Sequence, residues 1–151
     1  MTETMIRIGL TGGAGAGKST CARLLAAQGC HVLDTDDLAR SFTEPGHPCL
    51  KQITEAFGAG LLDAEGRLRR GALAQLVFAD PDKLRTLESI LHPPIRAAWQ
   101  EALQDWDKAG ASAGCVIIPL LYETAAETAF AVVIAVGCSS GTQRGRLLGR
   151  N

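Results

Sequence analysis

The sequence predicts an α/β domain with a doubly wound parallel sheet and one long helical insertion. A glycine-rich loop joins the apolar run Met5–Thr11 to a helical pattern, and a second apolar run follows within the length of one βαβ unit. Two more short apolar runs, 115–118 and 130–136, come late in the chain. Between them and the first two, a largely helical stretch of about residues 37–113 is too long for a single crossover.

Length and composition are those of one globular domain. The chain has 151 residues, of which 46% are hydrophobic and 21% charged, and it can therefore fold around its own core. Its 15 Lys and Arg nearly balance its 16 Asp and Glu, so charge gives no general reason to bind nucleic acid or an anionic membrane. The longest apolar run, Ala129–Val136, is far shorter than the ~20 residues of a membrane helix, and the N-terminus lacks a signal-peptide pattern. We expect no nucleic-acid partner, no membrane partner and a cytoplasmic location.

The cysteines are scattered and odd in number. No two of them form a C-x-x-C pair, which argues against a disulfide framework and against a zinc site. We interpret them as buried or partly buried thiols in a reducing compartment. They are Cys21, Cys30, Cys49, Cys115 and Cys138.

The N-terminal strands and helix are predicted from apolar runs and from the glycine and polar residues that end them. Met5–Thr11 reads as a buried strand that ends in glycines. Helical spacing begins at Lys18 and stops at Gly29, which is a typical C-terminal cap. Cys30–Asp34 is a second strand, followed by the polar letters TDD and another helix start. Such crossovers are nearly always right-handed, so the two strands are predicted to be parallel.

The middle of the chain is predicted to be mainly helical. Pro48–Phe57 reads as a short helix, and a polar turn occupies 63–71. Asp80 is a candidate N-cap with Pro81 in the first helical position, and an apolar stripe follows it. The stripe consists of Leu84, Leu87, Ile90 and Leu91.

Pro93 and Pro94 are predicted to interrupt this helix and to restart it. Ile95–Trp106 is then amphipathic, with Trp99 and Trp106 on one face and in the core. The remaining elements are a loop at 110–114, strands at Cys115–Ile118 and Phe130–Val136, and a basic helical stretch at Thr142–Arg150. The sheet core is therefore placed at 1–36 and 114–151, and the helical insertion at 37–113.

The glycine-rich loop fits the phosphate-binding pattern G-x-x-x-x-G-K-[ST]. Glycines allow successive backbone N–H groups to converge on phosphate oxygens, and the following helix adds its positive end. The Lys18 ammonium can bridge the β- and γ-phosphates of ATP, and the Ser19 hydroxyl can bind Mg²⁺. The alternative is a merely flexible loop, but a strand before it and a helix after it favour nucleotide binding and a P-loop NTPase fold. The nucleotide-binding residues are Gly12, Gly13, Ala14, Gly15, Ala16, Gly17, Lys18, Ser19 and Thr20.

Other motifs narrow the class of P-loop protein. The only asparagine is Asn151, which excludes the N-K-x-D motif of GTPases, and no S-G-G-Q stretch indicates a transporter ATPase. Carboxylates instead follow the second strand, at Asp34, Asp36 and Asp37. Strand carboxyl ends converge on the ligand crevice in a doubly wound sheet, so one carboxylate can orient Mg²⁺ while another accepts a proton, as in a small-molecule kinase. Helix N-capping is the alternative for all three, and we prefer it for Asp37.

The sequence resembles the dephospho-coenzyme A kinase family. The resemblance extends from about Ile6 to Arg150 and rests on several motifs in order, of which only the first would be specific alone. The motifs are IGLTGGAGAGKST at Ile8–Thr20, VLDTDDLAR at Val32–Arg40, E-P-G-x-P at Glu44–Pro48, G-x-L-x-R-x-x-L at Gly66–Leu73, L-H-P at Leu91–Pro93 and P-L-L-[FY]-E at Pro119–Glu123.

The resemblance implies that ATP, with Mg²⁺, phosphorylates the ribose 3′-hydroxyl of dephospho-coenzyme A. By motif position Asp36 would be the general base, and Thr11 would lie beside the reacting phosphate. The helical insertion would bind coenzyme A. Arg146 and Arg150 align with the basic helix that enters the lid over ATP.

The same resemblance suggests acceptor-binding residues. Guanidinium groups pair well with phosphate, so the cluster Arg67, Arg69 and Arg70 is a candidate, Arg70 above all; a solvated charged turn is the alternative. His92 either lies near the acceptor or bonds backbone at a helix boundary, and Glu123 either faces the acceptor or starts a helix. The candidate substrate-binding residues are Asp34, Arg70, His92, Leu121 and Glu123.

The chain ends at Asn151, where the family pattern continues. We therefore expect a sheet of four strands, a truncated lid, no adenine-contacting segment after a last strand, and impaired catalysis. Two other functions stay open: a nucleotide-binding module without full catalysis, and a kinase for another small hydroxyl compound. The sequence leaves the oligomeric state undetermined.

Overall fold

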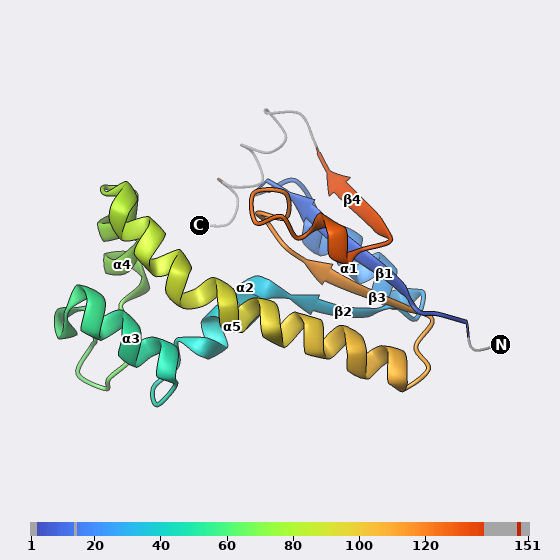
Figure 1. The fold of residues 1–151 in the computed structure, drawn as a ribbon. Coiled ribbons are helices and arrows are strands. Elements are labelled where there is room, and N and C mark those ends of the chain that lie inside the picture. The colour runs from blue at the N-terminus through green and yellow to red at the C-terminus, as the bar shows by residue number, and fades with distance from the viewer. Residues whose placement is uncertain (1–2, 14, 138–147, 149–151) are drawn as a thin grey trace. The chain divides into compact units, whose positions relative to one another are not determined.

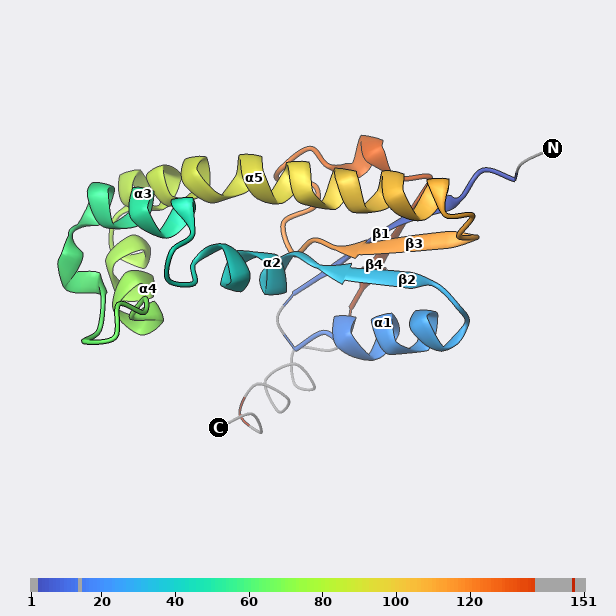
Figure 2. The ribbon, with the colours of Figure 1, turned by 90° about the horizontal axis from the view of Figure 1, so that it is seen from below.

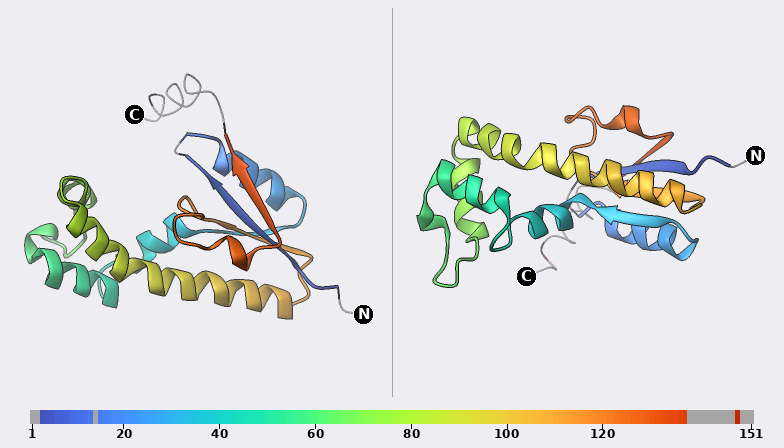
Figure 3. Two further views of the ribbon diagram at one scale, coloured as in Figure 1. Left: turned by 45° about the horizontal axis from the view of Figure 1, so that its top comes forward. Right: turned by 60° about the horizontal axis from the view of Figure 1, so that its bottom comes forward.

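A parallel sheet in the order β2-β3-β1-β4 forms the centre of the fold (Figure 1). The computed structural model describes residues 3–13, 15–137 and 148. All three strand pairs are parallel, and β1 and β4 run side by side in the left view of Figure 3. The α/β class and the four-stranded parallel sheet are thus confirmed. The strands are β1 Ile6–Gly12, β2 His31–Asp34, β3 Ala113–Ile117 and β4 Val132–Val136.

The chain divides into two compact units. One holds the chain up to Thr35 and from Trp99 onward, and the other holds Asp36–Ala98. The first unit thus takes in residues 99–108 at the end of the longest helix, which the sequence had assigned to the insertion at 37–113. The helices are α1 Lys18–Ala27, α2 Thr35–Phe42, α3 Pro48–Phe57, α4 Arg70–Phe78 and α5 Pro81–Lys108, and two short 3₁₀ turns are η1 Ala59–Leu61 and η2 Glu127–Ala129.

Both faces of the sheet are covered, by α1 on one side and by the C-terminal part of α5 on the other (Figure 2). On the α1 side, Leu10, Ala22, Cys115 and Ile117 form a buried cluster. Burial raises the pKa of the Cys115 thiol to about 12, with smaller contributions from Cys30 and Cys21. The thiol is therefore neutral and inert, as a core residue should be.

The opposite face of the sheet needs a glycine in the middle of β1. A Cβ added to Gly9 would lie 2.7 Å from Leu121 Cδ1 and 2.8 Å from Phe130 Cδ2. Leu121 is fully buried, and the Phe130 ring stacks on Trp99 with centroids 5.3 Å apart. Gly9 thus lets the segment after β3 pack directly on the strand.

The second unit has its own core. Its buried residues come from α3, η1 and α4: Ile53, Leu61, Leu73 and Val77. The predicted stripe on the first half of α5 packs against this cluster, as the spacing indicates: Leu84, Leu87, Ile90 and Leu91.

The strand predicted at Cys115–Ile118 starts earlier, at Ala113, and the one predicted at Phe130–Val136 starts later, at Val132. Two predicted boundaries in the helical part of the chain are also wrong. α5 continues through Pro93 and Pro94 as one helix, although proline removes a helical hydrogen bond. Packing on both flanks holds it: the leucine-rich stripe precedes the prolines, and the buried Trp99 and Leu103 follow them. The polar turn predicted to extend to residue 71 also ends earlier, because α4 starts at Arg70.

The described cysteines are free thiols, buried at Cys49 and Cys115 and half-buried at Cys21 and Cys30. Cys138 and most of the basic stretch Thr142–Arg150 lie outside the described residues. Among the helices that the structure describes, none combines the length and the apolar character needed to span a bilayer.

Candidate functional site

The glycine-rich loop joins β1 directly to α1, as predicted. Gly15 and Gly17 have φ angles of 74° and 106°, which favour glycine, and Gly12 has a φ angle of 155°. A Cβ on Gly12 would also lie 2.5 Å from the Val136 carbonyl oxygen. Between these glycines the Ala16 amide donates to the Gly13 carbonyl at 3.1 Å and closes a turn. The loop shape therefore depends on its glycines.

Lys18 is the first residue of α1, and its side chain folds back over the loop. The ammonium donates to the carbonyl oxygens of Gly12 at 2.6 Å and Gly13 at 3.0 Å. The N-cap residue is Gly17, which has no side chain to cap the helix, so the positive end of α1 is open to an anion. Ser19 and Thr20 are exposed in the first turn. Ala14 lies outside the described residues.

Side-chain hydrogen bonds connect the carboxyl ends of three neighbouring strands beside this loop. Thr11, at the end of β1, donates its hydroxyl hydrogen to the Pro119 carbonyl at 3.1 Å. Thr35 follows β2 and donates to the Ile117 carbonyl, at the end of β3, at 2.8 Å. Asp34 is half-buried and pairs in register with Ile117. The sequence pattern did not single out Thr35, although its place directly after a strand was a usable signal.

The other predicted carboxylates have different settings. Asp36 and Asp37 are exposed in the first turn of α2, at the start of the second unit. Glu123 is exposed in the turn after β3 and does not start a helix. Leu121, two residues earlier, is fully buried against Gly9 and is thus a core residue of the first unit. His92 is exposed within α5.

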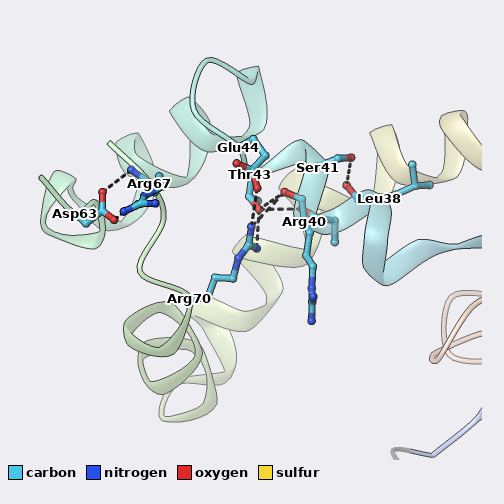
Figure 4. Close-up of polar contacts among 9 residues, drawn as sticks. Leu38, Arg40, Ser41, Thr43, Glu44, Asp63, Arg67 and Arg70 are labelled. Carbon is cyan, nitrogen blue, oxygen red and sulfur yellow. Dashed lines mark hydrogen bonds and ion pairs between the residues drawn. The ribbon is translucent and has the colours of Figure 1, made fainter. Parts of the chain in front are cut away.

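Arg70 makes contacts that the sequence did not reveal (Figure 4). Its guanidinium donates to the hydroxyl of the buried Thr43 at 2.9 Å and to the Arg40 carbonyl at 3.3 Å. It also lies 3.6 Å from the Glu44 carboxylate. These partners form the end of α2 and the turn after it, so Arg70 fastens α4 to that turn.

The two other arginines of the predicted cluster are also engaged locally. Arg67 contacts Asp63 at 3.1 Å and Glu65 at 3.4 Å. The pKa of Asp63 is lowered mainly by the hydrogen bond that its carboxylate accepts from the Arg67 backbone amide. The Glu65 amide and the Arg67 guanidinium lower it further. Arg69 donates to the Gly60 carbonyl at 3.5 Å. Arg146 and Arg150 lie outside the described residues.

Comparison with known proteins bears directly on this arrangement. The family model described as Dephospho-CoA kinase matches residues 6–151. The chain belongs to the dephospho-CoA kinase family. A relative named dephospho-CoA kinase from Anaeromyxobacter dehalogenans is 44% identical over 144 residues, which cover 95% of this chain and 68% of that protein. Another from Streptomyces avermitilis is 42% identical and covers 95% and 69%.

Solved structures agree with the family. The crystal structure of TT1252 from Thermus thermophilus has a TM-score of 0.79 at 36% identity, covering 98% of this chain and 73% of that one. Dephospho-CoA kinase from Campylobacter jejuni has a TM-score of 0.66 at 26% identity, covering 95% and 79%. Membership of the family makes ATP use and the P-loop NTPase fold properties of this chain.

Proposed function

We propose that this protein transfers the γ-phosphoryl group of ATP to the ribose 3′-hydroxyl of dephospho-coenzyme A, which gives coenzyme A and ADP. The observation that carries the proposal is the glycine-shaped loop with Lys18 at the start of α1, in a chain that belongs to this family. Phosphoryl transfer needs positioning and charge neutralisation more than covalent chemistry, and the loop offers both.

On this proposal the loop residues 12–20, with Thr11 beside them, bind the triphosphate. When ATP binds, the Lys18 ammonium donates to β- and γ-phosphate oxygens in place of the Gly12 and Gly13 carbonyls, because carbonyl and phosphate oxygens are both hydrogen-bond acceptors. Mg²⁺ would neutralise phosphate charge, and the exposed Ser19 hydroxyl is a hard oxygen ligand of the kind it takes.

The acceptor hydroxyl needs a proton acceptor as it attacks. We assign this role to Asp36, whose carboxylate is exposed in the first turn of α2. The hydroxyl oxygen forms a bond to the γ-phosphorus, the bond to the ADP oxygen breaks, and the hydroxyl proton passes to Asp36. Asp34 would support the metal or its water. His92, Glu123 and the lid arginines Arg146 and Arg150 stay predictions for acceptor and nucleotide contacts.

The test is a coupled assay of ADP release with ATP and Mg²⁺, run without acceptor, with dephospho-coenzyme A, and with adenosine or a sugar acid. We expect stimulation by dephospho-coenzyme A alone. Equal stimulation by other hydroxyl compounds would favour a different small-molecule kinase. ATP binding with no turnover under any condition would favour a nucleotide-binding module instead.

A further inference from the structure

Each arginine in the predicted phosphate-binding cluster contacts a neighbour in the same unit, and Arg69 does so through the Gly60 carbonyl at 3.5 Å. Arg70 is paired with Glu44, and Arg67 is paired with Asp63 and Glu65. In an arginine that is already paired, the carboxylate and an incoming phosphate compete for the same guanidinium donors. The acceptor of the proposed function carries a diphosphate at its ribose 5′ position, and a cation without a charged partner is well suited to bind it.

Arg40 on α2 fits this description. It is exposed, and among the described residues its guanidinium has no ion pair and no hydrogen bond. Figure 4 shows its side chain extending from α2 away from Glu44, while its backbone carbonyl accepts from Arg70. Arg40 thus contributes to the fold through its backbone carbonyl, and its side chain is available for another contact.

The position of Arg40 relative to Asp36 is fixed by helix geometry. The two residues are four apart on α2, and such pairs are neighbours on one helix face. Leu38 and Phe42 are half-buried on the other side of the helix. One helical turn of about 5.4 Å is similar to the span of a ribose from its 3′-hydroxyl to its 5′-phosphate. A hydroxyl held at Asp36 therefore brings the 5′-diphosphate within reach of Arg40.

We propose that Arg40 binds the diphosphate of the acceptor, and that Arg70 is a positioning residue which holds the last turn of α2. This inference rests on the proposed function and on Asp36 as its base. A guanidinium fork can bind two phosphate oxygens at once, which suits a diphosphate. Arg70 acts through α2 because its bonds end on the Arg40 carbonyl and on Thr43.

Calorimetric titration of the full chain tests the role of Arg40. We expect Arg40→Gln to weaken dephospho-coenzyme A binding about 10- to 100-fold, as the loss of a charged hydrogen bond predicts, and Arg40→Lys to weaken it less. Adenosine, which lacks the diphosphate, should bind all variants alike. The matched control is Arg85→Gln, because Arg85 is an exposed arginine that pairs with Asp82 in the same unit.

The outcomes separate the two proposals. If the unchanged protein fails to bind dephospho-coenzyme A, the proposed function itself is contradicted. If it binds but Arg40→Gln binds equally well, only the inference about Arg40 fails. If Arg40→Gln does not fold, Arg40→Lys decides: weaker binding of dephospho-coenzyme A with normal adenosine binding supports the inference, and equal losses overturn it.

Hydrogen exchange tests the positioning role of Arg70. The amides of Thr43 and Glu44 donate to the Arg40 and Ser41 carbonyls at the end of α2. Arg70→Gln should speed exchange at these amides and weaken dephospho-coenzyme A binding, whereas Arg40→Gln should weaken binding with normal exchange. Weaker binding in Arg70→Gln with unchanged exchange would mean that Arg70 contacts the acceptor itself.

Discussion

At the scale of single residues, the proposal depends most on Asp36. Replacing it by asparagine keeps the shape but removes the proton acceptor, so turnover should fall about 10²- to 10⁴-fold while ATP affinity stays unchanged. Steady-state kinetics and nucleotide titration measure the two effects separately. Asp37→Asn is the matched control. Asp37 is equally exposed in the same turn, and this variant should keep the activity of the unchanged protein. A loss of ATP binding in Asp36→Asn would contradict its role as base.

Lys18 gives a second prediction at this scale. Lys18→Ala removes the ammonium that the loop holds against Gly12 and Gly13, and ATP affinity should fall at least about tenfold, the effect of one charged hydrogen bond. Titration with ATP and Mg²⁺ measures it. Lys51→Ala, which removes an exposed lysine paired with Glu55, should bind ATP normally. Unchanged ATP affinity in Lys18→Ala would exclude the proposed cradle.

The sequence predicts single residues well where local spacing decides their place. The loop glycines and Lys18 lie where the motif puts them, because the motif is one continuous turn between two elements. The contacts of Arg70 could not be predicted in this way, because its partners Thr43 and Glu44 are distant in sequence and only folding brings them close. Leu121 resembled a substrate contact by its motif, but its burial against Gly9 depends on the chain's return over β1.

At the scale of elements, β1 depends on close approach by the segment that follows β3. Gly9→Ala puts a methyl group against Leu121 and Phe130, and should lower the free energy of unfolding by about 1–3 kcal/mol through overpacking. Thermal or urea unfolding measures it. Gly71→Ala is the control, because Gly71 lies in α4 with open space around its Cβ position, and alanine there should be neutral or stabilising by up to about 1 kcal/mol. An unchanged stability in Gly9→Ala would contradict the packing of this face.

The strands and the first crossover follow from apolar runs and glycine punctuation, so they were predictable. The continuity of α5 through Pro93 and Pro94 was not, because local sequence shows the lost hydrogen bonds but not the cores on either side. The start of α4 at Arg70 was hidden for a related reason. The segment before it is rich in charged residues, and tertiary contacts of Arg70 stabilise its first turn.

At the scale of the whole molecule, the two units divide the proposed chemistry. The unit with the sheet contains the loop for the triphosphate, and the unit Asp36–Ala98 contains the proposed base and the acceptor-binding arginine. The sequence predicted an insertion of this kind, but its boundary within α5 depends on packing that no local pattern shows. The prediction of the family rests on several separated motifs, which together extend over nearly the whole chain.

The most direct test follows the phosphoryl group itself. The protein is incubated with ATP labelled at the γ-phosphate, Mg²⁺ and dephospho-coenzyme A, and the products are separated and identified by mass spectrometry. We predict that the label appears in the 3′-phosphate of coenzyme A, and that Asp36→Asn abolishes most of this transfer. Label that stays in ATP, or passes only to free phosphate at a rate independent of the acceptor, would contradict the proposed kinase.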